Sequence, residues 1–272
     1  MMKRQFRGAA FAAAPFLIGS TAYSQGAQYT APRNAVVDAA GARTVEVDAA
    51  AGILRVEGKP GLRQVQITGT ARASSQRLLN EIKLIAERRG DLVFIKADMP
   101  DHNGSRWDDD WSVALDLVIQ VPQGINADIS DGSGDTKIFN VGALEASDGS
   151  GDFSVDGAAG SVRISDGSGN LTIENVGGDV RLTDGSGDIN VRNVSGSFTV
   201  ETDGSGSIYA TDVRGSVVVE NDGSGEIEVK QVGKDFRVEH KGSGNIDYAD
   251  VSGRVDIPER HRDRRYRSGG DN

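Results

Sequence analysis

The second half of the chain repeats one short block of alternating apolar and polar residues. In one copy Ile189 and Val191 are followed by Val194, and after a glycine come Phe198 and Val200. Each apolar-x-apolar triplet points two apolar side chains to one face of a strand and its middle residue to the other. Valine and isoleucine are frequent at these positions, which is typical of strands. The block therefore predicts two short strands separated by a glycine-marked turn.

A Gly-Ser-Gly triplet, usually preceded by aspartate, begins each block. It occurs seven times, starting at Gly132, Gly149, Gly167, Gly185, Gly204, Gly223 and Gly242. Successive starts are 17, 18, 18, 19, 19 and 19 residues apart. A near-constant period of this size indicates a stacked repeat. Glycine supplies the positive φ that a sharp corner between strands requires.

We therefore predict an all-β fold in which residues 130–258 form a parallel β-helix, or β-solenoid, of about seven coils. Parallel stacking would place equivalent residues of successive coils about 4.8 Å apart. One coil buries too few apolar side chains to offset the entropy of ordering its backbone, so each coil depends on its neighbours. The alternative is an antiparallel β-sandwich of hairpins, because turn signals every 8–12 residues fit that fold as well.

Residues 44–129 read as an irregular N-terminal β region that caps the solenoid. An open end would expose strand edges and invite aggregation. Residues 45–67 alternate in a way that suggests an irregular coil, and a short helix is expected over Ser74–Asn80, capped by Ser74 or Ser75. A hairpin over residues 82–96 follows, with a single helix over 74–88 as the alternative. Residues 113–121 predict a strong strand that ends at Pro122.

The two ends of the chain differ in character from the rest. Residues 1–24 resemble a secretion signal, with Lys3, Arg4 and Arg7 before the apolar stretch 8–19 and a cleavage box at 22–24. We expect export to the periplasm or secretion, with no membrane span in the mature chain. Two further segments are expected to lack regular structure: a linker at 25–43 and a basic, disordered tail at 259–272 that begins after Pro258.

Charge and cysteine content narrow the possible partners. The formal net charge is −10, and removal of the three positive charges of the signal would make it −13. Such a balance argues against nucleic acid as a partner. The chain has no cysteine, so it contains neither disulfides nor thiolate metal sites.

The aspartates that precede the Gly-Ser-Gly triplets are the first candidate site. They form one column: Asp131, Asp148, Asp166, Asp184, Asp203 and Asp222. Bound cations, calcium above all, would explain stacked carboxylates. The other interpretation is that each aspartate starts a turn with its charge outside and screened by solvent. A second column after the triplets varies in charge, which favours the turn interpretation, and the spacing matches neither an EF-hand loop nor the nonapeptide calcium repeat.

The second candidate is an acidic cluster outside the repeats. It consists of Asp101, His102, Asp108, Asp109 and Asp110, flanked by Trp107 and Trp111. A glycan-cleaving β-helix would need clustered acids of this kind, but a solvated loop has the same composition. The serine of the repeated triplet is not in a nucleophile elbow, because no helix follows it. The cluster predicts a solvated loop more readily than a catalytic site.

Several segments together resemble the putative-adhesin family of exported bacterial β-strand-repeat proteins. The resemblance rests on Gly52–Gly58, on the strand ending Val121-Pro122-Gln123-Gly124, and on the serial Ser-Asp-Gly-Ser-Gly-Asp coils, and it covers residues 44–257. It implies a β-strand-repeat fold and an adhesin-like role, and it carries over no catalytic residue.

We therefore predict a non-enzymatic, exported β-solenoid that acts as an adhesin-like interaction or scaffold protein of the bacterial envelope. Envelope or surface glycans or proteins are the expected partners, and no cofactor is expected. Arg163, Arg181 and Arg237 form a modest basic patch among the outward residues. Two alternatives remain, a calcium-binding repeat protein and a polysaccharide-processing β-helix enzyme centred on residues 101–110.

Overall fold

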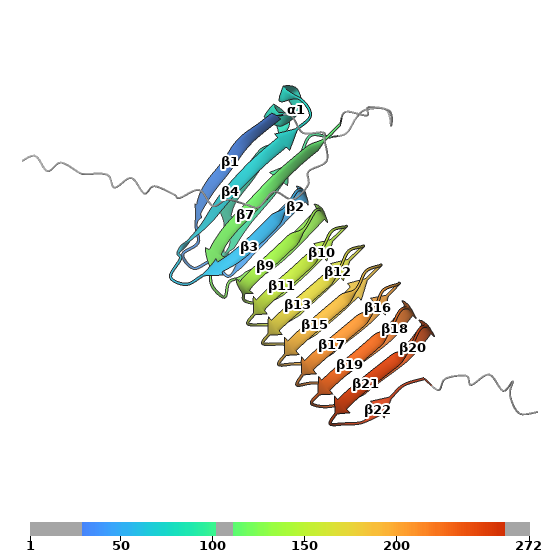
Figure 1. The fold of residues 1–272 in the computed structure, drawn as a ribbon. Coiled ribbons are helices and arrows are strands. Elements are labelled where there is room, and N and C mark those ends of the chain that lie inside the picture. The colour runs from blue at the N-terminus through green and yellow to red at the C-terminus, as the bar shows by residue number, and fades with distance from the viewer. Residues whose placement is uncertain (1–28, 102–110, 259–272) are drawn as a thin grey trace, which may run out of the picture.

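The computed structural model of the protein describes residues 29–101 and 111–258. They form two sheets of eleven strands each that face one another across a narrow interior (Figure 1). The first sheet contains, in spatial order, β1 (Tyr29–Asp38), β4 (Gln64–Ala73), β7 (Val113–Pro122), β3 (Leu54–Lys59), β9 (Thr136–Val141), β11 (Phe153–Ala158), β13 (Leu171–Val176), β15 (Ile189–Val194), β17 (Ile208–Val213), β19 (Ile227–Val232) and β21 (Ile246–Val251). The second contains β22 (Val255–Asp256), β20 (Phe236–Ser243), β18 (Val217–Ser224), β16 (Phe198–Asp203), β14 (Val180–Asp184), β12 (Val162–Asp166), β10 (Leu144–Asp148), β8 (Asn126–Ser133), β2 (Thr44–Ala51), β6 (Leu92–Asp98) and β5 (Lys83–Arg89).

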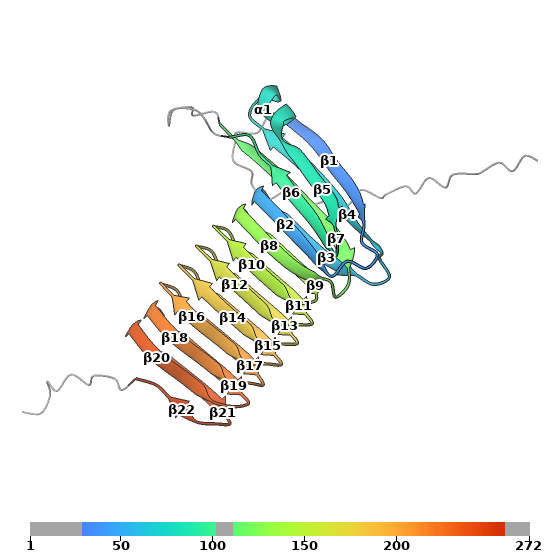
Figure 2. The same cartoon turned by 180° about the vertical axis from the view of Figure 1, so that it is seen from behind.

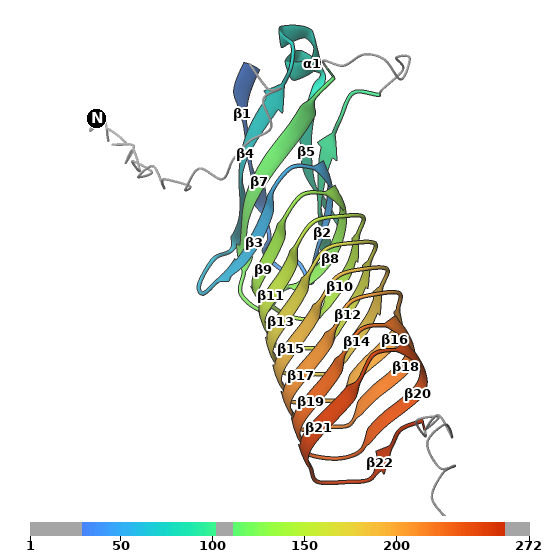
Figure 3. The same ribbon diagram turned by 45° about the vertical axis from the view of Figure 1, so that its right-hand side comes forward.

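Consecutive repeats stack as parallel coils, as Figure 3 shows, and equivalent residues of successive coils lie opposite one another. Each coil contributes one strand to each sheet, so β11 pairs with β13 and β12 pairs with β14. Phe153 lies opposite Leu171, which lies opposite Ile189. The prediction of a parallel β-solenoid of about seven coils is confirmed, and the antiparallel β-sandwich is wrong for the repeats.

The interior is filled by files of equivalent apolar side chains. Phe153, Leu171, Ile189, Ile208 and Ile227 form one file, and all are fully buried. The apolar-x-apolar triplets produce these files because alternate residues of a strand share a face. Each coil buries apolar area against the coil on either side. This burial supplies the favourable free energy of folding that a single coil lacks.

Glycine is required at the corner between the two sheets because successive corners pack backbone against backbone. The last glycine of each Gly-Ser-Gly triplet has positive φ, for example 138° at Gly187. A Cβ atom on Gly187 would lie 1.7 Å from the carbonyl oxygen of Gly169 in the preceding coil. The backbone N–H of Gly187 donates to the carbonyl of Ser205 in the next coil, so the corners also continue the hydrogen-bond ladder.

The solenoid begins before the first Gly-Ser-Gly triplet. β2 and β3 form a coil that stacks in parallel on β8 and β9, so the expected irregular coil in residues 45–67 is present over its first half. Residues 60–125 are inserted between this coil and the next. Within the insertion β4 and β7 pair antiparallel, and β1 extends this antiparallel edge at the covered end of the solenoid (Figure 2).

The helix and hairpin of the insertion follow the sequence prediction. Helix α1 (Gln76–Glu81) is capped by Ser75, whose side chain accepts a hydrogen bond from the N–H of Leu78. β5 and β6 form the expected hairpin, so the alternative of a single helix over 74–88 is wrong. The expectation of a linker at 25–43 is wrong for Tyr29–Asp38, which forms β1 and pairs with β4 along its whole length.

The far end of the solenoid is formed by β21 and the two-residue strand β22. Side chains there are more exposed than in the earlier coils, and Tyr248 is 48% exposed. Regular pairing stops two residues before Pro258, as expected for a residue that cannot donate a ladder hydrogen bond. In the described part of the chain no helix has the length and apolar character needed to cross a membrane. The predicted signal (1–24) and tail (259–272) lie outside the described residues.

Candidate functional site

One corner of the solenoid carries a file of side-chain amides. Asn140, Asn175 and Asn193 occupy equivalent positions near the ends of β9, β13 and β15, and all three have the left-handed backbone conformation, with φ between 54° and 60°. Asparagine tolerates this conformation better than most residues because its short side chain bonds locally. The left-handed residue interrupts the strand and turns the chain towards the second sheet.

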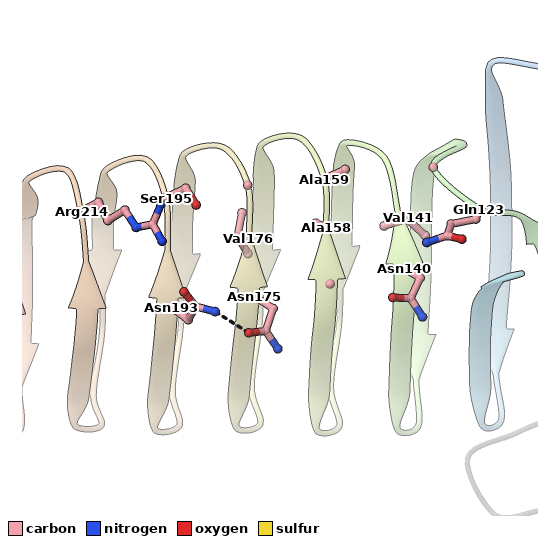
Figure 4. A pocket seen from close by; sticks show the side chains of 13 residues that line it. Gln123, Asn140, Val141, Ala158, Ala159, Asn175, Val176, Asn193, Ser195 and Arg214 are labelled. Atoms are coloured by element: carbon pink, nitrogen blue, oxygen red, sulfur yellow. Dashed lines mark hydrogen bonds between the residues drawn. The ribbon is translucent and has the colours of Figure 1, made fainter. Parts of the chain in front are cut away.

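Two of these amides, those of Asn175 and Asn193, bond to each other across adjacent coils. The Nδ2 of Asn193 donates to Oδ1 of Asn175 at 2.6 Å (Figure 4). The Nδ2 of Asn175 donates in turn to Oδ1 of Asp156 at 2.6 Å. Cross-coil bonds of this kind fix the rotamers of the amides. Asn175 and Asn193 are thereby held on adjacent coils, about 4.8 Å apart, whereas Gly157 occupies the equivalent position between Asn140 and Asn175.

A groove of about 510 Å³ runs along this file, and we call it the amide groove. Figure 4 shows Gln123 and Asn140 towards one end and Arg214 at the other. Its lining consists of polar and small residues: Gln123, Gly124, Asn140, Val141, Gly157, Ala158, Ala159, Asn175, Val176, Gly177, Asn193, Ser195 and Arg214. The groove crosses successive coils, so a ligand that filled it would be extended along the solenoid axis.

A second groove of about 480 Å³, which we call the charged groove, lies on the second-sheet side of the same row of turns. Its lining includes Asp128, Glu145, Arg163 and Arg181. Burial, and then repulsion from Glu145, raises the pKa of Asp128 above its usual range. The groove therefore presents both signs of charge along a short distance.

The expected basic patch is largely neutralised. Glu201 lies 2.9 Å from Arg181 and 3.5 Å from Arg163, so one carboxylate is shared by two of the three arginines. Arg237 pairs with Glu239 at 3.2 Å. Exposed pairs of this kind contribute little stability, but they remove the net positive charge that an anionic glycan or lipid headgroup would need.

The aspartates before the Gly-Ser-Gly triplets form a second feature, which we call the acid column. All six side chains are buried, with residue exposures of 1–5%: Asp131, Asp148, Asp166, Asp184, Asp203 and Asp222. The expectation that their charge lies outside and is screened by solvent is wrong. Four of the six aspartates follow two inward apolar residues at alternate positions, as Val162 and Ile164 precede Asp166, and therefore share their face. Asp203 and Asp222 follow one additional residue and are buried as well.

Most carboxylate oxygens of the acid column have no hydrogen-bond partner among the described residues. Both oxygens of Asp148, Asp166, Asp184 and Asp203 are unpaired. Burial, and then repulsion from Asp166, raises the pKa of Asp148 to about 6, while the nearby backbone N–H groups of Gly149 and Ser150 lower it. These N–H groups lie close to the carboxylate but outside hydrogen-bonding geometry.

Burial is the leading cause of the shift along the rest of the column. It raises the pKa of Asp131 and of Asp166 to about 6, and that of Asp203 to about 7. Burial also raises the pKa of Asp184. Repulsion between neighbouring carboxylates adds to the shift at Asp131, Asp166 and Asp203.

Each end of the acid column has a polar partner. At the first end the hydroxyl of Thr136 donates to Oδ2 of Asp131 at 2.8 Å. At the other end Lys241 replaces the aspartate of the seventh coil. Its buried ammonium group donates to Asp222 and, at 2.8 Å each, to the carbonyl oxygens of Gly225 and Ser243.

The second column, after the triplets, stabilises turns. Its side chains accept the backbone N–H of the equivalent residue in the next coil: Asp152 bonds to Asp135, Asn170 to Asp152, Asp188 to Asn170 and Ser207 to Asp188, at 2.9–3.4 Å. Aspartate and asparagine serve equally well as acceptors, which explains the varied charge. The turn interpretation is confirmed for this column.

The other candidates are only partly described. Asp101 is exposed, and Trp111 lies partly buried against the core. His102, Trp107 and Asp108–Asp110 lie outside the described residues, so the catalytic hypothesis for this cluster remains a prediction. Within residues 29–101 and 111–258, no group of three or more histidine, aspartate or glutamate side chains converges in a way that could hold a metal ion.

Comparison with solved structures finds matches to several bacterial proteins. A putative cell adhesion protein from Clostridium sporogenes matches at 13% identity and a TM-score of 0.33, over 84% of this chain and 99% of its own. A putative adhesin from Bacteroides fragilis matches at 13% identity and a TM-score of 0.40, over 82% and 99%. A putative lipid binding protein from Parabacteroides distasonis matches at 12% identity and a TM-score of 0.31, over 82% and 96%.

No family model and no curated protein matches the chain. The names of the similar structures agree with the resemblance to putative adhesins that the sequence predicted. Likeness at this level of identity concerns the overall fold alone.

Proposed function

We propose that the protein is an exported, non-enzymatic β-solenoid that acts as an adhesin-like interaction protein of the bacterial envelope and binds an extended surface glycan along the amide groove. The observation that carries this proposal is the groove itself, with the amides of Asn175 and Asn193 fixed by cross-coil hydrogen bonds. Export is proposed from residues 1–24, whose pattern is that of a secretion signal.

The chemistry of the groove favours an uncharged, hydroxyl-rich polymer. Amide groups both donate and accept hydrogen bonds, as sugar hydroxyls do. The amide groove holds one charged side chain, Arg214, and no aromatic one. Each sugar unit would therefore gain a few modest hydrogen bonds, and affinity would grow with the number of coils that one polymer contacts at the same time.

The rigidity of the groove supports the proposal as well. The Nδ2 of Asn193 is held by Asn175, and the backbone of each coil is bonded to both neighbours. Because the site is already ordered, a ligand loses little binding free energy to ordering the protein. A scaffold of this kind suits repeated weak contacts better than a catalytic cycle.

An Ala159→Trp substitution is expected to weaken glycan binding at least about tenfold. Ala159 is exposed and lines the amide groove, so an indole ring there would fill the groove without entering the core. Binding of the purified chain to a glycan array and to isolated surface polysaccharides is the measurement. Each tenfold loss corresponds to about 1.4 kcal/mol of binding free energy.

Ser165→Trp is the matched control, because Ser165 is exposed on the outer face of β12 and does not line either groove. This variant should bind as the unaltered chain does. Equal binding by both tryptophan variants would place the ligand elsewhere, and failure of the unaltered chain to bind any glycan would contradict the proposed function.

A further inference from the structure

The acid column is a continuous internal file that the proposed glycan binding does not use. Strand pairing places Asp131 opposite Asp148, and the register continues through Asp166, Asp184, Asp203 and Asp222. Adjacent parallel strands are about 4.8 Å apart, so each carboxyl group has another at that spacing. Buried polar groups normally have hydrogen-bond partners, so a buried carboxyl group without one requires a physical explanation.

The surroundings of the acid column supply very little positive charge. In the first sheet, the position of Thr136 is taken by apolar residues in the following coils: Phe153, Leu171, Ile189, Ile208 and Ile227. On the capped side β2 places Ala50 opposite Asp131. The turn acids Asp135, Asp152, Asp188 and Glu226 are exposed on the outside of the corner.

Lys241 is therefore the one cation at the column among the described residues, and the column contains six buried carboxyl groups. It contacts Asp222, but it lies five coils from Asp148 and six coils from Asp131. Six ionised carboxylates in such an interior would repel one another strongly, because the water and counterions that would screen their charges are excluded.

The packing of the corner favours protons over metal ions as the neutralising species. A calcium ion takes six to eight oxygen ligands, and no group of three acidic or histidine side chains converges in the described residues. The corner glycines pack so closely that a Cβ atom at Gly206 would lie 1.8 Å from the carbonyl oxygen of Gly187. A proton needs no added volume, and a protonated carboxyl can donate to a neighbouring carboxylate.

We propose that the acid column is a proton-binding site, in which part of the buried carboxyl groups hold protons in acid-to-carboxylate hydrogen bonds near neutral pH, so that the solenoid loses stability as these protons leave. The site is internal and independent of the amide groove. Its occupant is the proton alone, and the corner turns of six coils share it.

The direction of the pH dependence follows from the shifts given above. The pKa values of Asp131, Asp148 and Asp166 are raised from 3.8 to about 6, and that of Asp203 to about 7. The folded protein therefore binds more protons than the unfolded chain between these limits, and stability falls as pH rises. This contribution is complete below about pH 4 and is lost as pH rises through 6 and 7.

Thermal unfolding of the full chain between pH 5 and pH 8 tests the proposal. We expect the melting temperature to fall over this range. An Asp184→Asn variant, which replaces a carboxyl by a neutral amide of the same shape, should melt roughly 3–8 °C higher than the unaltered chain at pH 8 and differ little at pH 5. Asp188→Asn changes an exposed turn acid in the same coil and should follow the unaltered chain at both values.

Infrared difference spectra of the unaltered chain, with carbon-13 in its aspartate carboxyl groups, provide a readout that does not depend on any variant. A protonated carboxyl signal should persist at pH 6 and disappear by about pH 8. Absence of this signal at pH 6, or equal melting temperatures at pH 5 and pH 8, would overturn the proposal. So would a saturable rise in melting temperature at pH 8 with calcium or potassium chloride, relative to choline chloride of equal ionic strength, because a metal ion would then occupy the column.

Discussion

A Gly187→Ala variant is expected to lose about 4 kcal/mol or more of its free energy of unfolding. The new Cβ atom would lie 1.7 Å from the carbonyl oxygen of Gly169, and φ at this position is 138°. The atoms nearest to this Cβ all belong to the backbone of Gly169, so no side chain can rotate to relieve the overlap. The two coils would have to separate, which would break the bond from the N–H of Gly169 to the carbonyl of Ser186.

Urea denaturation followed by circular dichroism measures this effect. Gly61→Ala is the matched control, because Gly61 also has positive φ, at 75°, yet a Cβ atom there meets nothing within 4 Å. The control should lose only the cost of the left-handed conformation, about 1 kcal/mol. Equal losses in the two variants would show that the close approach between corners does not limit the stability of the solenoid.

A Lys241→Met variant is expected to be destabilised by about 3 kcal/mol or more at pH 8. The Lys241 side chain is 5% exposed and that of Asp222 is 1% exposed, so methionine would leave a buried carboxylate without its cation. The carbonyl oxygens of Gly225 and Ser243 would each lose a donor as well. Melting temperature and urea denaturation measure the loss.

Two further variants separate the charge effect from the loss of the lysine chain. Lys234→Met removes an exposed lysine from the turn before β20 and should change stability by less than about 0.5 kcal/mol. Adding Asp222→Asn to Lys241→Met should restore most of the lost stability, because the unpaired charge is removed. If the double variant were no more stable than the single one, pairing with Asp222 would not be the role of Lys241.

The repeat could be predicted from the sequence because the Gly-Ser-Gly triplets recur at a near-constant period and apolar-x-apolar triplets lie between them. The Gly-Ser-Gly triplets predict the position of the corner, and the apolar-x-apolar triplets predict the inward faces of the strands. Together they predict the coil and the stacking of successive coils. α1 was readable for the same local reason, since Ser75 precedes a short apolar pair and can accept the N–H of Leu78. These features depend on residues close together in the chain.

The prediction that the aspartate side chains point to solvent is wrong, although the alternation of the strands already indicates that they point inward. Ala127, Ile129 and Asp131 occupy alternate positions of β8, so all three share the inward face. The interpretation placed a charged residue at a corner in solvent, where aspartate is common. The strand continues through the aspartate, and the turn begins after it, so the periodicity of the strand determined the direction.

Two other features depend on contacts that a local pattern does not reveal. β1 has only weak alternation, and its strand conformation comes from pairing with β4, which is 26 or more residues further along the chain. The amide groove is a product of the left-handed residues at the corner. The recurrent asparagine in Asn-Val, at 140, 175 and 193, was the available signal for it.

The change from 18 to 19 residues per coil takes place on the outside of the solenoid. Between β14 and β16, Leu182 pairs with Val200 and Thr183 with Thr202, so Glu201 is the additional residue. Glu201 turns outward to Arg181 and Arg163, while Asp184 and Asp203 remain aligned. Coils of unequal length are thus interchangeable modules: insertions of single residues before the corner would diversify the exterior and leave the internal alignment unchanged.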